Sequence, residues 1–432
     1  MERSERTIVR SFHAMVPARG IVERVERALE LAGELGHLGA VWELDADGAR
    51  ERARSLAERA TRGEDVGPLA GTVCGWKDCF DVAGLHATGG APWLAAAGPV
   101  TRSAGVVKRM EAAGAVSLGK LAMTQLAWGM MGQTPGRPTC RNPHDPERVP
   151  GGSSSGSAVA VATAIVDHAP GTDAGGSVRY PAAACGVVGF KPTYGTVPLD
   201  GCMPYAPSFD TGGSIARSVA EAALQHAVLT DTPPVELEGG LGGLRIAFLA
   251  GYFTAALTDD VAAMLERTRG RVRADEIDLS WSQDDNRSMS PIFVAEPGAY
   301  VRAHDPDPDP ELYDPTTFAD VQSSPAVLAV DYLQARAALA EAQRRCAAAA
   351  AGYDVLLCAS APCPPFPIDG PDKTTRMNAL TKPFNGLGWP ALSLPAGLDR
   401  DGLPLGLQVV GLPGNEAVVL RAASALEALL QG

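Results

Sequence analysis

Two clusters of glycine and serine, separated by a small apolar segment, hold the residues best suited to chemistry. The first reads GGSSSGS from Gly151 to Ser157, and the second reads GTDAGGS from Gly171 to Ser177. Serine hydroxyls can attack an electrophile or relay a proton, and glycines let the backbone approach a ligand closely. Upstream, Lys77 follows the largely apolar run TVCGW. Burial at the end of such a run would make this lysine lose its charge readily.

Each feature alone has a more ordinary interpretation. An isolated GGSSSGS segment is typical of a flexible loop, and a single lysine is typical of a solvated charge. A phosphate-binding loop is a further alternative, but the Gly-Lys-Ser/Thr ending of that motif is missing. The Ala/Val-rich segment between Ser157 and His168 predicts a buried helix. The occurrence of both clusters together with Lys77 favours a catalytic site.

Over these same residues the chain closely resembles the amidase signature family of serine amidohydrolases. The matching motifs are Lys77-Asp78, GGSSSGSA from Gly151, and GTDAGGSVRYPAAACGVVGFKPTYG from Gly171, with Ser177 24 residues after Ser153. Weaker resemblance extends from about residue 20 to the end. The resemblance implies that Ser177 is the nucleophile, Ser153 a bridging serine and Lys77 the base.

The resemblance also implies how these groups act. A serine hydroxyl needs a base, so Ser153 would take the proton of Ser177 and pass its own to a neutral Lys77. The expected hydrogen-bond chain runs from Ser177 to Ser153 to Lys77, with a cis peptide between Gly152 and Ser153. The oxyanion would lie on backbone N–H groups, those of Ala174, Gly175, Gly176 and Ser177. Water would hydrolyse the acyl-enzyme, and neither a metal nor an organic cofactor is needed.

Further charged residues match the family and are expected to support the nucleophile loop. Thr172, Asp173 and Arg179 are interpreted as a buried polar network, and a matching downstream segment carries Asp210. Buried charges need partners, so either Asp173 or Asp210 is expected to pair with Arg179.

The substrate pocket is predicted in two places. Core packing is the ordinary interpretation of Trp128, Met130 and Met131, but the resemblance implies that this stretch lines the acyl pocket. The family often has Glu-Phe-Ala just before it, where this chain has Gln125-Leu126-Ala127. Substrate-contacting residues are also expected in the Pro-rich segment 362–385, which includes Arg376.

By length alone the 432 residues could form one large domain or two to three average ones, and the resemblance implies a single amidase domain over residues 1–432. The pattern of elements predicts an α/β fold. Helices are expected over 20–35, 45–62, 106–115, 218–229, 326–351 and 415–430, and strands over 72–76, 115–118, 244–249, 354–359, 391–394 and 405–410. Their alternation indicates a layered fold, which the resemblance makes a mixed central sheet covered by helices on both faces. The N-terminal helices would pack on the outside, the signature core would cover about 70–220, and about 250–325 would be a variable substrate region. The segment 304–315 is expected to be an exposed loop because proline recurs.

The net charge of −13 argues against a nucleic-acid partner, which needs a basic face. No signal peptide or membrane-spanning run stands out, and none of the eight cysteines forms a CxxC pair. A cytoplasmic location is therefore expected. The expected binding partner is a small-molecule amide substrate. A homodimer is a possible assembly of the chain.

The sequence thus predicts a small-molecule amidase that releases ammonia or an amine from a carboxamide. Its alternatives are a hydrolase of urea-type or carboxylated amides, the glutaminase-like subunit of a tRNA-dependent amidotransferase, and an acyltransferase that uses an amine instead of water. A catalytically inactive binding module is a further alternative, against which the joint presence of Lys77, Ser153 and Ser177 argues.

Overall fold

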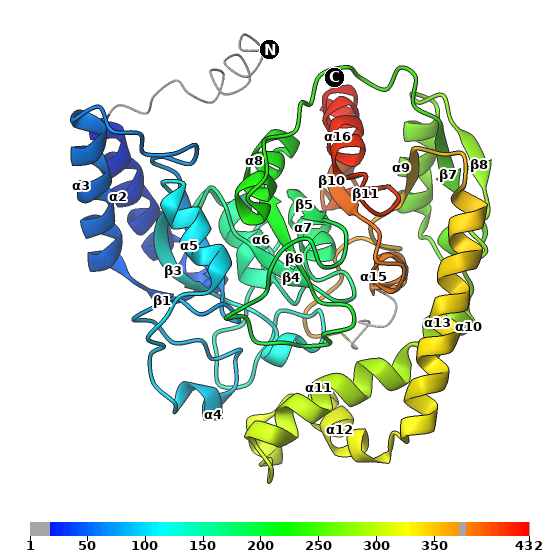
Figure 1. Cartoon of the computed structure of the whole chain (residues 1–432), viewed down its shortest axis with the longest axis horizontal. Coiled ribbons are helices and arrows are strands. Elements are labelled where there is room, and N and C mark those ends of the chain that lie inside the picture. The colour runs from blue at the N-terminus through cyan, green and yellow to red at the C-terminus, as the bar shows by residue number, and fades with distance from the viewer. Residues whose placement is uncertain (1–17, 371–376, 432) are drawn as a thin grey trace.

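The computed structural model describes residues 18–370 and 377–431. Eight strands of this part of the chain form one sheet in the order β4-β6-β5-β10-β11-β9-β7-β8, and three more form a second sheet in the order β1-β3-β2 (Figure 1). The strands are β1 (Val41–Leu44), β2 (Val73–Lys77), β3 (Val116–Leu121), β4 (Gly171–Asp173), β5 (Val188–Lys191), β6 (Thr211–Ala216), β7 (Ile246–Leu249), β8 (Asp275–Ile277), β9 (Val355–Ala359), β10 (Ala391–Leu398) and β11 (Pro404–Val410).

The helices lie around these sheets. They are α2 (Ala18–Glu34), α3 (Ala46–Thr61), α4 (Pro92–Ala95), α5 (Gly105–Ala112), α6 (Ser155–Ala162), α7 (Arg179–Cys185), α8 (Val219–Thr230), α9 (Asp259–Arg269), α10 (Gln283–Ser288), α11 (Ser290–His304), α12 (Pro315–Ser323), α13 (Ala329–Ala350), α15 (Lys382–Gly386) and α16 (Glu416–Gln431). Figure 1 shows α2 and α3 together at one end of the molecule and α10 and α13 together at the other.

The large sheet is mixed. The five strand pairs from β4 to β9 are antiparallel, whereas β7 pairs with both β9 and β8 in parallel. The helix pair α6 and α7 packs on this sheet, and so does the pair α8 and α16. The predicted class, a mixed sheet with helices around it, is confirmed. Most predicted helices and strands agree with the structure to within three residues at each end.

The small sheet was not anticipated as a separate layer. Its strands β2 and β3 are parallel, β1 and β3 are antiparallel, and helices α2 and α3 pack against it with their apolar residues buried. The region 250–325, for which the sequence analysis expected no particular helix or strand, contains regular structure, including α9 to α12 and β8. The segment 304–315 is mostly exposed, as predicted, with one turn of 3-10 helix at Pro310–Leu312.

The packing of α6 explains why its sequence is so rich in small residues. Residues Ser155 to Val161 are all buried between the sheets. A Cβ added at Gly156 would lie 2.4 Å from both Ala122 N and Ala40 O, so this position requires glycine. This close packing holds the first glycine-serine cluster against the carboxyl ends of strands β2 and β3 of the small sheet.

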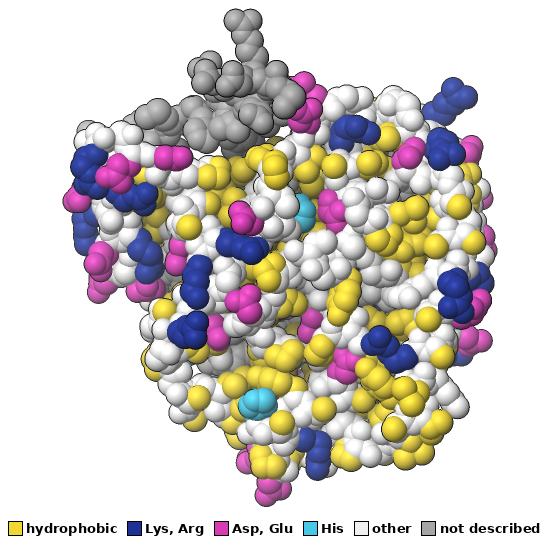
Figure 2. Space-filling model, in the orientation of Figure 1, with side chains coloured by type: hydrophobic (Ala, Val, Ile, Leu, Met, Phe, Trp, Pro, Cys, Tyr) yellow, Lys and Arg dark blue, Asp and Glu magenta, His cyan; other side chains and the backbone are white. Residues whose placement is uncertain are grey.

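On the face shown in Figure 2, Lys and Arg side chains are interspersed with Asp and Glu rather than gathered in one basic surface. Within residues 18–370 and 377–431 no helix is long and apolar enough to cross a bilayer. No group of three or more His, Cys, Asp or Glu side chains in this part of the chain is arranged to hold a metal ion.

Candidate active site

Lys77 ends the buried strand β2, and its side chain is completely buried. Its Nζ donates hydrogen bonds to Ser153 Oγ at 2.8 Å and to Thr172 Oγ1 at 2.7 Å, and lies 3.4 Å from the Thr172 carbonyl oxygen. The predicted contact between Lys77 and Ser153 is therefore present. Thr172, which was expected only to support the nucleophile loop, contacts the lysine amine directly.

Burial lowers the pKa of Lys77, because a charged amine loses its hydration inside the protein. The nearby groups Cys79, Cys202, Asp210 and Asp173 oppose this shift without reversing it. The direction agrees with the sequence prediction. A lysine with a lowered pKa has a larger fraction of neutral amine near neutral pH, and only the neutral amine can accept a proton.

Ser153 lies in the loop that leads into α6 and is completely buried. The peptide bond between Gly152 and Ser153 is cis, as predicted. The backbone of this loop is fixed on both sides, since Thr124 N donates to Ser153 O at 3.1 Å and Ser154 N donates to Ser177 O at 3.2 Å. The two glycine-serine clusters are thus in direct contact.

Ser177 lies at the other side of this contact, 8% exposed and in the wall of a pocket. Among the hydrogen bonds of the described residues, none joins the hydroxyls of Ser177 and Ser153, so the second link of the expected chain is not formed in this structure. Catalytic hydrogen bonds are often long without substrate and tighten when it binds. The backbone contact between the clusters keeps the two serines neighbours.

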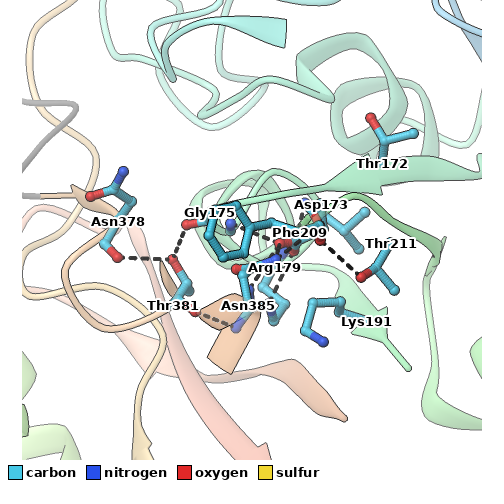
Figure 3. A network of polar contacts seen from close by, with 12 residues as sticks. Thr172, Asp173, Gly175, Arg179, Lys191, Phe209, Thr211, Asn378, Thr381 and Asn385 are labelled. Atoms are coloured by element: carbon cyan, nitrogen blue, oxygen red, sulfur yellow. Dashed lines mark hydrogen bonds and ion pairs between the residues drawn. The ribbon is translucent and has the colours of Figure 1, made fainter. Parts of the chain in front are cut away.

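Asp173 and Arg179 form a fully buried ion pair behind the nucleophile loop (Figure 3). Arg179 Nη2 and Nε lie 2.9 Å and 3.0 Å from the Asp173 carboxylate. The remaining guanidinium donors reach Thr381 O, Gln408 Oε1 and Asn385 Oδ1. Arg179 holds the pKa of Asp173 well below its usual range against the opposing effect of burial. The expected supporting network is present, with Asp173 as the partner of Arg179.

Asp173 also holds the backbone of the nucleophile loop. It accepts hydrogen bonds from Gly176 N at 2.7 Å and Val178 N at 3.1 Å. The Gly176 N–H is therefore already engaged, whereas those of Ala174, Gly175 and Ser177 have no acceptor within the described residues. Gly176 has φ +128°, and a Cβ there would lie 2.1 Å from Thr381 Oγ1, so only glycine fits.

Asp210 does not join the Arg179 network. Its carboxylate accepts from Tyr205 N at 2.9 Å, and burial raises its pKa to about 6. Antiparallel pairing of β4 with β6 sets Asp173 opposite Thr211, which places Asp210 just beyond the pair. Its charge acts on Lys77, whose own charge in turn lowers the pKa of Asp210.

The pocket beside Ser177 has a volume of about 300 Å³. Trp128, Met130 and Met131 line it, as the resemblance implied. Predicted residue Arg376 lies outside the described residues. Further lining residues come from α11, from α12 and the residue before it, and from the segment around α15: Phe293, Asp314, Thr316, Thr317, Asp320, Asn378 and Lys382.

The family model described as Amidase matches residues 23–420. The chain belongs to the amidase signature family. It is 35% identical to a glutamyl-tRNA(Gln) amidotransferase subunit from Anaeromyxobacter sp. (strain K), over 97% of this chain and 95% of that protein. It is 30% identical to the AtzE subunit of 1-carboxybiuret hydrolase from Pseudomonas sp. (strain ADP), over 88% of each chain.

Solved structures give the same assignment. A structure described as "Crystal structure of amidase" has a TM-score of 0.89 and 32% identity, covering 95% of this chain and 96% of the other. A chain from "An unexpected vestigial protein complex reveals the evolutionary origins of an s-triazine catabolic enzyme" has a TM-score of 0.90 and 28% identity, with 96% of each chain covered. This amidase signature protein is therefore an amide-hydrolysing enzyme.

Sequence reasoning missed three residues that shape the site of this amidase. Lys382 lies in the pocket wall next to the nucleophile loop. Buried Gln125, noticed only as a departure from the family pattern, bonds to Leu312 O at 2.7 Å and accepts from Asp314 N at 2.9 Å. Lys120, also buried, pairs with Asp78 at 3.1 Å. Gln125 and Lys120 could have been found from the sequence, because each is a polar residue within a largely apolar run.

Proposed function

We propose that this chain is a small-molecule amidase that forms an acyl-enzyme on Ser177. The observation that carries the proposal is the 2.8 Å contact between buried Lys77 and Ser153, set directly behind a serine that faces a pocket. An amine with a lowered pKa in contact with one serine, and a second serine beside it, is the arrangement that activates a hydroxyl nucleophile.

In the first step Ser177 Oγ attacks the carbonyl carbon of the amide. Its proton passes to Ser153, whose own proton passes to the neutral amine of Lys77, which becomes an ammonium. The carbonyl oxygen gains the negative charge. We assign its stabilisation to the N–H groups of Ala174, Gly175 and Ser177, because Gly176 N–H already donates to Asp173.

In the second step the C–N bond breaks, and the proton returns through Ser153 to the leaving nitrogen, which departs as ammonia or an amine. Water then attacks the ester carbon and gives up a proton to the same relay. The carboxylate leaves, and Ser177 regains its hydroxyl. These steps need only groups of this chain and water.

The pocket supports a small substrate. Its volume of about 300 Å³ lies at the low end of the range for small-molecule sites. Its wall combines Trp128, Met130 and Met131 with hydroxyl and carboxylate side chains of α12.

A panel of primary and N-substituted amides, assayed for ammonia or amine release, tests the proposal. The wild-type protein should hydrolyse at least one of them, and Ser177→Ala should lower the rate by a factor of about 10³ or more while keeping its fold. Equal rates in the two proteins would refute the role of Ser177. Product analysis with added hydroxylamine or alkylamine distinguishes transfer to an amine from hydrolysis.

A second candidate is a role as the amidase subunit of a complex, because the two named relatives are themselves described as subunits. Size-exclusion chromatography of the native protein from its own cells tests this function. A single peak at the mass of one or two chains, fully active alone, would contradict it.

A further inference from the structure

Lys382 is the first residue of α15, and it lines the pocket that Ser177 also lines. Its Cγ lies 4.0 Å from the position that a Cβ on Gly175 would take, so the side chain runs along the nucleophile loop. The preceding residue, Thr381, donates to Gly175 O at 2.8 Å and fixes this arrangement. Lys382 is therefore held next to the place where an amide would react.

The amine of Lys382 contacts the aromatic ring of Phe293, and no carboxylate of the described residues pairs with it. Its Nζ lies 4.2 Å from the ring centroid of Phe293, and within the described residues it makes no hydrogen bond or ion pair. Among the described residues three lysines are completely buried, and each has an oxygen partner: Lys77 has Ser153, Lys120 has Asp78, and Lys191 has the Pro192 carbonyl. Lys382 is instead partly exposed at the pocket wall and has no such oxygen within the described residues, so its amine is open to a partner that enters the pocket.

The carboxylates of the pocket do not fill this role. Asp314 Oδ1 accepts from Thr316 N and Thr317 N at the start of α12, and Asp320 Oδ2 accepts from Trp128 Nε1. Burial lowers the pKa of Lys382 to about 8, with no carboxylate opposing the shift. The amine is therefore still mostly protonated at pH 7, with three N–H donors at the pocket wall.

We infer that the substrate carries a carboxylate and that the ammonium of Lys382 binds it while the amide carbonyl lies at Ser177. This inference rests on the proposed amidase function and adds the chemical class of its substrate. Phe293 holds the amine from one side, which leaves its donors for the ligand. A carboxylate suits the site because it is a compact anion, and a charge-assisted hydrogen bond to it is stronger than one between neutral groups.

Matched pairs of amides test the inference. Succinamic acid and succinamide differ only in a terminal carboxylate or carboxamide, and glutaramic acid and glutaramide form the same pair with one more methylene. We expect wild-type kcat/KM to favour the acid by about 10-fold or more in at least one pair. In Lys382→Met, which keeps most of the length of the side chain and removes its charge, the preference for the acid should fall to within about threefold of unity.

Two control variants distinguish binding from general damage. Lys382→Arg should retain a preference for the acid, because the cation remains. Lys108→Met removes the same charge from an exposed site on α5 and should leave the preference at its wild-type value. A wild-type enzyme that prefers the neutral amides, or a Lys382→Met variant that keeps the preference, would overturn the inference.

A binding measurement covers the case in which neither pair is hydrolysed. Calorimetric titration of Ser177→Ala should show binding of succinamic or glutaramic acid that is lost in Ser177→Ala/Lys382→Met. No binding of either acid, or equal binding in the two proteins, would overturn the role of Lys382. Full activity in Ser177→Ala would instead refute the proposed nucleophile and leave the preference test of Lys382 intact.

Discussion

Replacing Asp173 by alanine should destabilise the protein by about 3–5 kcal/mol, the usual cost of leaving one member of a buried ion pair alone. Both Asp173 and Arg179 are 0% exposed. The substitution removes both carboxylate oxygens, which accept two hydrogen bonds from the guanidinium, three from the backbone N–H groups of Gly176, Val178 and Arg179, and one from Asn385 Nδ2. Arg179 would keep Thr381, Gln408 and Asn385 as neutral partners, which cannot balance its charge.

This cost can be converted to a melting temperature. Unfolding entropy scales to about 0.9 kcal/mol per kelvin for a chain of 432 residues, so Tm should fall by about 3–6 °C. Scanning calorimetry measures the shift. The double variant Asp173→Leu/Arg179→Met should recover at least half of it, because no charge is then left buried. Asp260→Ala, which breaks an ion pair with the exposed Arg400, is the matched control and should cost about 1 kcal/mol or less.

The Asp173 carboxylate also has a depressed pKa, so its contribution to stability is present above its unfolded pKa of about 4 and is lost as pH falls below that value. The double variant should therefore lose less stability than wild type between pH 5 and pH 2. A single variant within about 1 kcal/mol of wild type, or a double variant as unstable as the single one, would refute the role given to this ion pair.

Three further predictions concern activity. If neutral Lys77 is the base, kcat/KM should rise as the pH rises through the lowered pKa of Lys77. Lys77→Met should abolish this rise in the pH–rate profile together with most of the rate. An unchanged profile in the variant would mean that another group is the base. Thr172→Val should lower kcat about tenfold with little change in KM, because the 2.7 Å contact between Thr172 Oγ1 and the lysine amine is lost. Thr172→Ser keeps the hydroxyl and should retain most of the rate. Equal rates in the wild type and both variants would argue against a role of Thr172 in positioning Lys77. Gln125→Ala should raise KM about fivefold, since it frees the pocket wall at Asp314, and an unaltered KM would contradict that connection.

The sequence predicted local structure well where apolar runs were continuous. Lys77 was placed correctly at the end of a buried strand because five largely apolar residues precede it. Trp128 lines the cavity beside Ser177, although its own sequence pattern also fits core packing; its contact with a substrate stays a prediction from the resemblance. The small sheet was missed because strand pairing between β1 and β3 joins residues about 80 positions apart, which no local pattern reports.

The parts of the site that could not be predicted depend on side-chain orientation within the nucleophile loop and on one long-range contact. The sequence offered two carboxylates for Arg179, and the structure pairs it with Asp173, six positions away across the same loop, whereas Asp210 accepts from Tyr205 N. Lys382 lies in a segment rich in proline and turn residues, and the Thr381 contact with Gly175 brings it to the nucleophile loop from 206 positions away. The hydrogen bond from Gly176 N–H to Asp173 also depends on the orientation of the Asp173 side chain, which no sequence pattern reports.

The central claim, that Ser177 forms the covalent acyl-enzyme, is tested most directly by chemical labelling. The wild-type protein is treated with a fluorophosphonate, digested and mapped by mass spectrometry. One phosphonyl group should be found on the peptide that contains Ser177, and labelling should be lost in Ser177→Ala and strongly reduced in Lys77→Met. An adduct on a different serine, or labelling that persists in Ser177→Ala, would contradict the account.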